Sequence, residues 1–148
     1  MSDVWELWSG SFSLVSGVDS DGDGVSNLRE SIAGTDPFDI DDYLAGALNL
    51  AAAELILAWP AAAYKEYEVW GSQDLGAWLK LSGPTPIRYT QPMDAQFAMT
   101  PALDGEAYRL AVGDADADGD GVSDWSESVL GTTIEDPRPL DIPLKNDR

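Results

Sequence analysis

The central part of the chain alternates apolar and polar residues in short runs. Gly, Pro and Asp separate these runs between residues 43 and 113, with Pro60, Gly71 and Pro92 among the breaks. Alternation with a period of two is typical of half-buried strands. The pattern predicts seven strands, at 45–50, 54–59, 65–71, 77–82, 86–91, 95–100 and 106–112. Many short strands at regular spacing indicate a mainly β fold, an antiparallel β-sandwich.

The phase of the alternation assigns side chains to the two faces of the strands. Glu66, Glu68 and Lys80 are predicted to point outward, and Trp59 and Trp78 to anchor the core. The inward faces are predicted to carry Tyr67 with Val69, Leu79 with Leu81, and Tyr108 with Leu110 and Val112. The strand region is small for a full sandwich, so the flanking segments should pack against it. We expect one edge to be covered by Trp5, Leu7, Trp8 and Phe12, and another by Trp125.

Two segments that flank the strand region repeat one twelve-residue pattern. Residues 19–30 read DSDGDGVSNLRE and residues 116–127 read DADGDGVSDWSE. Both carry Asp at positions 1, 3 and 5, Gly at 6, Asn or Asp at 9 and Glu at 12, the ligand pattern of an EF-hand calcium loop. Calcium takes about six to eight oxygen ligands, which this pattern supplies. The sequence therefore predicts two Ca²⁺ sites, with ligands from Asp19, Asp21, Asp23, Val25 (carbonyl), Asn27 and Glu30, and from Asp116, Asp118, Asp120, Val122 (carbonyl), Asp124 and Glu127.

The flanks of these loops differ from those of paired EF-hands. A strand pattern precedes the second loop, where an EF-hand needs an entering helix. Short exit helices are predicted at Asn27–Ala33, ending at Gly34, and at Asp124–Leu130, ending at Gly131. Each unit is therefore a loop with one short helix.

Charge and composition exclude several classes of function. The net charge of −19 divides into −9 over residues 1–42, −3 over 43–113 and −7 over 114–148. No basic cluster exists to meet phosphates, so nucleic acid is not expected as a partner. The absence of Cys and His excludes disulfides, thiolate nucleophiles, zinc sites of the Cys/His type and His-based triads. The acids outside the loops are scattered, so we expect no catalysis.

The first loop and its exit helix resemble a known calcium repeat. Residues 19–37, DSDGDGVSNLRESIAGTDP, are similar to the bacterial thrombospondin type 3 repeat, in which an Asp-rich loop runs into a short helix and a GTDP turn. Residues 116–137 resemble it as well, except that Gly131-Thr132-Thr133 lacks the acid found at Asp36.

The strand region resembles a second family. The segments LILAWP (residues 55–60), YEV (67–69) and SQDL (72–75), with Trp78 and YRL (108–110), are similar to Ig/fibronectin III-like modules. The resemblances imply an N-terminal segment with calcium loop 1 and its helix at 1–42, a β-sandwich at 43–113, calcium loop 2 and its helix at 114–137, and a Pro-rich tail or linker at 138–148.

These resemblances imply a non-enzymatic, calcium-binding structural or adhesive module of a secreted or cell-surface bacterial protein. Ca²⁺ would rigidify the junctions between repeats, and the partners would be neighbouring repeats or copies of the chain itself. No apolar run is long enough for a membrane span, and no signal peptide is expected.

Two alternative functions remain open. One is a carbohydrate-binding module of an extracellular enzyme, in which Trp70 on the outer face stacks on polysaccharide. The other is a self-assembling extracellular filament subunit. The competing interpretation of Trp70 is that a neighbouring segment, such as Trp5–Trp8, covers its ring.

Overall fold

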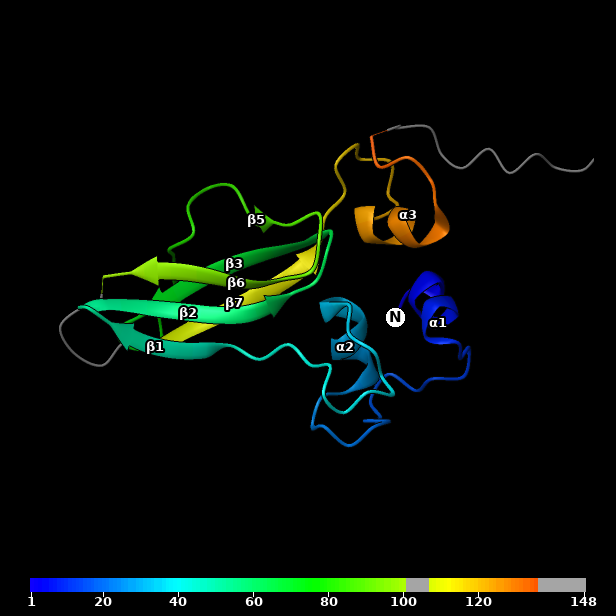
Figure 1. Ribbon diagram of the computed structural model, residues 1–148, viewed down its shortest axis with the longest axis horizontal. Coiled ribbons are helices and arrows are strands. Elements are labelled where there is room, and N and C mark those ends of the chain that lie inside the picture. The colour runs from blue at the N-terminus through cyan, green and yellow to red at the C-terminus, as the bar shows by residue number, and fades with distance from the viewer. Residues whose placement is uncertain (101–106, 136–148) are drawn as a thin grey trace, which may run out of the picture.

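The computed structural model describes residues 1–100 and 107–135 (Figure 1). Each of the seven predicted strand segments overlaps a strand, so the mainly β prediction is confirmed. The elements follow the order α1 (Asp3–Ser9), α2 (Asn27–Ala33), β1 (Ala47–Ala51), β2 (Glu54–Ala61), β3 (Lys65–Ser72), β4 (Leu79–Lys80), β5 (Ile87–Arg88), β6 (Met93–Met99), β7 (Ala107–Asp114) and α3 (Asp124–Leu130). The tail at 138–148 lies outside the described residues, so its role as a linker stays a prediction.

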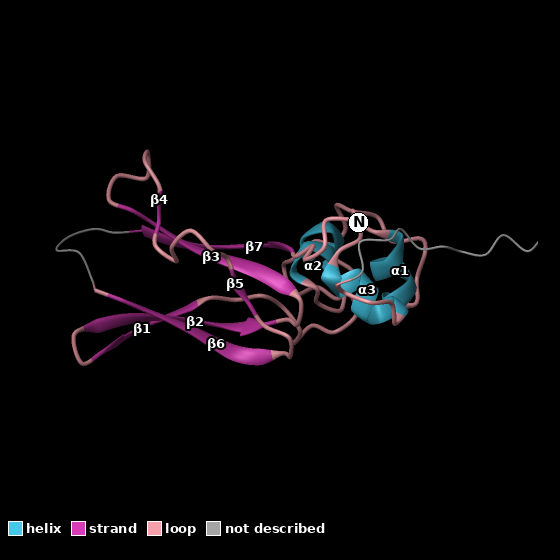
Figure 2. Ribbon diagram, turned by 90° about the horizontal axis from the view of Figure 1, so that it is seen from above, coloured by secondary structure: helices cyan, strands magenta, loops and turns pink. Residues whose placement is uncertain are grey.

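The strands form two antiparallel sheets that face each other as two layers (Figure 2). The first sheet has the order β1-β2-β6, with Leu57 opposite Leu48 on one side and Phe97 on the other. In the second sheet β3 is central: it pairs with β7 over its whole length and with the short strands β4 and β5. This arrangement is consistent with a β-sandwich.

The core lies between the two sheets. Leu57, Trp59, Tyr67 and Val69 are buried there, and the Trp59 and Tyr67 rings lie 5.6 Å apart between centroids. Tyr67 also accepts a hydrogen bond from the Ala62 N–H through its hydroxyl oxygen (2.7 Å), which satisfies the buried hydroxyl. Trp59 is thus the core anchor that the alternation predicted.

Two core predictions at the end of the second sheet are wrong. Trp78 is only half-buried, and its ring lies 4.6 Å from the Arg109 guanidinium on the surface. Leu79 is 69% exposed. Strand β4 has only two residues, and Leu81 fills the space beside Gly71, where it lies 3.0 Å from the position a Cβ would take. Leu79 therefore lies beyond the packed part of the sheet.

The three helices gather at one end of the sandwich, which we call the helical end (Figures 1 and 2). Helix α1 was not predicted. The Ser2 hydroxyl accepts a hydrogen bond from the Trp5 N–H at its first turn (3.2 Å), and Gly10 ends it in the left-handed conformation. Within the described residues, no helix combines the length and apolar content that crossing a membrane requires.

Trp5 and Trp8 pack within the helical end, which corrects the expectation that the N-terminal aromatic residues cover a sandwich edge. The buried Trp5 donates from Nε1 to the Thr35 carbonyl (3.1 Å), and Trp8 meets Trp125 edge to face, with centroids 5.8 Å apart. Leu7 and Phe12 are largely exposed. The hydrogen bond from Trp5 to Thr35 holds α1 against the turn that follows α2.

Candidate metal centre

The first acidic loop brings its three aspartates together. One carboxylate oxygen from each of Asp19, Asp21 and Asp23 lies within 4.8 Å of the others. The Asp19 carboxylate accepts hydrogen bonds from the N–H groups of Gly22 (2.7 Å) and Gly24 (2.9 Å). These bonds lower the pKa of Asp19 and keep it ionised. The chain is therefore wrapped around a cluster of carboxylates.

The second loop repeats this arrangement. Carboxylate oxygens of Asp116, Asp118 and Asp120 lie within 4.8 Å of one another. Asp116 accepts from the N–H groups of Gly119 (2.8 Å) and Gly121 (3.1 Å), the same two loop positions that bind Asp19 in the first loop. Burial raises the pKa of Asp118, and the neighbouring acids Asp120 and Asp116 add to the effect. The two loops therefore share one backbone geometry.

A buried glutamate closes the first cluster from the following helix. Glu30 is 0% exposed, and neither of its carboxylate oxygens has a hydrogen-bond partner among the described residues. Its pKa is raised to about 7, mainly by burial and in smaller part by the charges of Asp21 and Asp23. Burying a carboxylate without a partner is costly. A cation bound between Glu30 and the aspartates would remove this cost.

The second loop has a comparable glutamate. Glu127 is buried on α3, and its Oε2 has no hydrogen-bond partner in the described part of the chain. Burial raises its pKa, and the charges of Asp118 and Asp120 contribute. Glu127 is thus a buried carboxylate beside the aspartates of the second loop, as Glu30 is beside those of the first.

The ninth loop position differs between the copies. Asn27 is 0% exposed, and its Nδ2 donates to the Val15 carbonyl (3.0 Å). Its buried Oδ1 has no hydrogen-bond partner among residues 1–100 and 107–135. Asp124 instead accepts from the Ala117 N–H through Oδ1 (2.7 Å). In both loops the backbone N–H of this residue donates to the carbonyl just before the loop, Val18 or Ala115, at 2.8 Å.

The donor set fits a hard cation. Buried oxygens without a hydrogen-bond partner within the described chain belong to Asp21, Asp23, Asn27 and Glu30 in the first loop and to Asp118 and Glu127 in the second. All are oxygens, the donors that Ca²⁺ and Mg²⁺ prefer. Val25 and Val122 contribute their N–H groups to Asp23 and Asp120, at 2.6 and 2.8 Å.

Lys65 joins the two loop–helix units to the sandwich. Its Nζ donates to the Ser31 carbonyl in α2 (3.3 Å) and to Asp114 Oδ1 (2.5 Å), and lies 5.1 Å from the centre of the Trp125 ring in α3. The side chain is 1% exposed. Sequence analysis missed this residue because a single Lys at the start of a strand gives no signal of partners 34 and 49 positions away.

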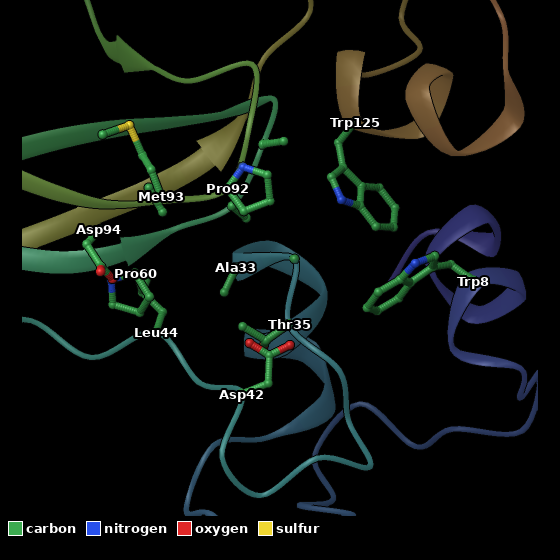
Figure 3. Close-up of a pocket in the computed structure, with 14 residues that line it drawn as sticks. Trp8, Ala33, Thr35, Asp42, Leu44, Pro60, Pro92, Met93, Asp94 and Trp125 are labelled. Atoms are coloured by element: carbon green, nitrogen blue, oxygen red, sulfur yellow. The ribbon is translucent and has the colours of Figure 1, made fainter.

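A groove separates the remainder of the helical end from the first sheet (Figure 3). It has a volume of about 560 Å³, with Trp8 and Trp125 on the helical side and Pro60, Pro92 and Met93 on the strand side.

Trp70, the candidate for sugar stacking in the alternative function, is half-buried on the outer face of β3. Its Nε1 donates to Glu68 (3.1 Å), and the Arg109 guanidinium lies 5.3 Å from its ring centre. Arg109 also lies over Trp78. The neighbour over Trp70 is thus Arg109, and the expectation that the Trp5–Trp8 segment covers it is wrong.

Comparison with known families gives one finding on the first loop. Residues 19–40 match the model of the bacterial TSP3 repeat, a family of calcium-binding structural repeats. No curated protein and no solved structure matches the chain. The segment that holds the buried Glu30 beside three aspartates is thus similar in sequence to a bacterial TSP3 repeat.

Proposed function

We propose that residues 19–30 and 116–127 each bind one Ca²⁺, which stabilises the module and takes part in no reaction. The main support is Glu30, a buried carboxylate beside three aspartates whose two oxygens have no hydrogen-bond partner in the described part of the chain. The first ion is held by Asp19, Asp21, Asp23, the Val25 carbonyl, Asn27 and Glu30, and the second by Asp116, Asp118, Asp120, the Val122 carbonyl, Asp124 and Glu127.

Calcium stabilises the folded chain by mass action, because the unfolded chain does not gather these oxygens. A ligand at about 100 times its dissociation constant adds roughly 2.7 kcal/mol to the free energy of unfolding. Calcium sites of extracellular modules bind at about 10⁻⁴–10⁻³ M. We infer a secreted or cell-surface module, for which the TSP3 match is the support.

The proposed role is structural or adhesive, with neighbouring repeats or further copies of the chain as partners. Both loop–helix units lie at the helical end, although they flank the strand region in sequence (Figure 1). Calcium therefore stiffens a single junction at that end and leaves the far end of the sandwich unaffected.

Calorimetric titration of the chelator-treated protein with CaCl₂ tests the proposal. We expect about two sites per chain and a rise in melting temperature. Glu30→Gln and Glu127→Gln should each remove one site, because an amide supplies neither the charge nor two anionic oxygens.

Glu54→Gln is the matched control, since Glu54 is exposed on β2, away from both loops. It should bind as the unmodified chain does. Unchanged stoichiometry in both loop variants would refute the assignment of ligands.

A further inference from the structure

The helices of the helical end are too short to be stable alone. Helices α1, α2 and α3 have seven residues each. Isolated helices shorter than about 12–15 residues are marginal in water, because the cost of nucleation is spread over too few hydrogen bonds. The order of each helix therefore depends on its contacts with the other helices, with the strands and with bound ions.

The buried part of these helices contains few apolar side chains. The buried apolar residues of the three helices are Trp5, Ala33 and Trp125. The remaining buried residues of the helices, four of which are proposed calcium ligands, are Asn27, Glu30, Asp124, Ser126 and Glu127. The two loop–helix units therefore share one small apolar cluster, and each depends on its ion for much of its order.

Helix α1 connects the two units. Trp5 donates from Nε1 to the Thr35 carbonyl (3.1 Å), and the Thr35 N–H donates to the Glu30 carbonyl (3.1 Å). One helical turn after Trp5, Trp8 packs edge to face on Trp125, with ring centroids 5.8 Å apart. Trp125 lies in the first turn of α3, between the two proposed ligands of that helix. One short helix thus contacts both ligand-bearing segments.

Lys65 forms a second connection between the units. Its Nζ donates to the carbonyl of Ser31, the residue after Glu30 in α2 (3.3 Å). It also donates to Asp114 Oδ1 (2.5 Å), two residues before the first aspartate of the second loop, and lies 5.1 Å from the centre of the Trp125 ring. The side chain is 1% exposed. A displacement of α2 relative to α3 would therefore break contacts of a buried ammonium group.

Direct repulsion between the two ions acts in the opposite direction, because an ion in one loop lowers the attraction of the molecule for the second. The acidic loops lie on opposite sides of the helical end, with α2 and α3 between them (Figure 1). A helix with its side chains is about 10–12 Å across, and the Debye length at physiological ionic strength is about 8 Å. Screening therefore weakens this repulsion, and the packing contacts should determine the sign of the coupling.

We propose that the two calcium sites are coupled through α1 and Lys65, so that an ion in one loop raises the calcium affinity of the other loop. This inference rests on the proposed function and adds a linkage between its two sites. The first ion orders the helix of its own unit, and α1 and Lys65 then restrict the other helix. The second ion binds a unit that is already ordered, so less conformational entropy is lost.

Calcium titrations of the full-length chain in about 0.15 M KCl measure the coupling. Glu127→Gln leaves the first site and Glu30→Gln leaves the second, so each variant gives the association constant of a single site. The coupling factor is the product of the two stepwise constants of the unmodified chain divided by the product of these single-site constants. We expect a factor of about five or more, since coupling between sites typically amounts to about 5–150-fold in affinity.

A coupling factor of one with two ions bound would overturn this inference and leave the proposed function intact. A chain that binds no calcium would overturn both. The two failures are therefore distinguishable in one set of titrations.

Variants of the two connections test the route of the coupling. Lys65→Met and Trp8→Ala should each lower the coupling factor severalfold, when Glu30→Gln and Glu127→Gln are made in the same background. Trp8 is 43% exposed, so Trp8→Ala removes the contact between α1 and α3 with little effect on the buried core. The matched controls are Lys80→Met and Trp78→Ala, on the second sheet outside the helical end. A coupling factor that is the same in the test variants and the controls would overturn the assignment to α1 and Lys65.

Hydrogen exchange provides a readout that does not depend on affinity. In Glu30→Gln, calcium binds the second loop alone, yet the α2 amides should exchange about threefold or more slowly with calcium than with chelator. Adding Trp8→Ala and Lys65→Met to this variant should abolish the slowing in α2 and retain it in α3. Slowing confined to α3 in Glu30→Gln itself would overturn the coupling.

Discussion

The Lys65 side chain connects the helical end to the sandwich through several contacts. It bonds α2 through the Ser31 carbonyl, pairs with Asp114, and lies over Trp125, while being almost fully buried. Lys65→Met keeps the length and removes the charge. We expect a loss of about 1–3 kcal/mol in the free energy of unfolding, since the hydrogen bonds of a charged donor to the Ser31 carbonyl and Asp114 are removed.

Lys80→Met is the control for this change. Lys80 pairs with Glu68 at 2.5 Å on the surface, so its loss should cost about 0–1 kcal/mol. Urea unfolding measures both variants. Equal costs would contradict the role given to Lys65.

The raised pKa of Glu30 predicts how the stability of the metal-free protein depends on pH. In the metal-free protein its folded-state pKa is raised from 4.5 to about 7, so the folded chain binds this proton more tightly than the unfolded chain. The stabilisation is complete below the unfolded pKa and is lost as pH rises through the folded value. The melting temperature of chelated protein should therefore fall between about pH 5 and pH 8.

Glu30→Gln should flatten this dependence, because the amide does not titrate. Thermal melts in a chelating buffer provide the measurement. With calcium present the order reverses, since the ion replaces the proton and binds more weakly at low pH. A melting temperature that rises with pH in the chelated protein would contradict the assignment.

At the scale of elements, both exit helices end at a glycine, but the two glycines should tolerate substitution differently. Gly34 and Gly131 both have positive φ, at 82° and 72°. A Cβ on Gly34 would lie 2.9 Å from Lys65 Cε, whereas a Cβ on Gly131 would have no atom of the described residues within 4 Å. Gly131→Ala should cost about 1–2 kcal/mol of backbone strain, and Gly34→Ala more. Thermal unfolding measures the difference; equal losses would show that Lys65 moves aside freely.

The elements also show what the sequence can predict. Each strand segment was visible because alternation is a local signal, and Asn27–Ala33 and Asp124–Leu130 are the helices that the glycine-ended pattern indicated. Helix α1 was missed because its tryptophans pack against residues that are distant in the sequence. Trp5 bonds Thr35, and Trp8 packs on Trp125, partners that alternation cannot identify. Trp78 was misplaced because its partner, Arg109, lies on another strand.

At the scale of the whole molecule, chelation should affect the two ends unequally. The proposed calcium ligands lie at the helical end, and the buried core of Trp59, Tyr67 and Val69 lies between the sheets. Adding EGTA should speed amide exchange in α2 and α3 by more than in β2 and β3, because local stability follows local contacts. Hydrogen exchange with mass spectrometry resolves these segments. Uniform acceleration would contradict a calcium role confined to one end.

Because both loop units lie at one end of the molecule, its stability should depend on ionic strength. The segments that hold them carry −9 and −7 of the total charge of −19, so a metal-free molecule confines most of its charge to one side. Screening acts over about 30 Å at 0.01 M salt and only about 3 Å at 1 M. Monovalent salt should therefore relieve part of this mutual repulsion, and the proposed stabilisation by calcium should be largest in dilute water and smaller in brine.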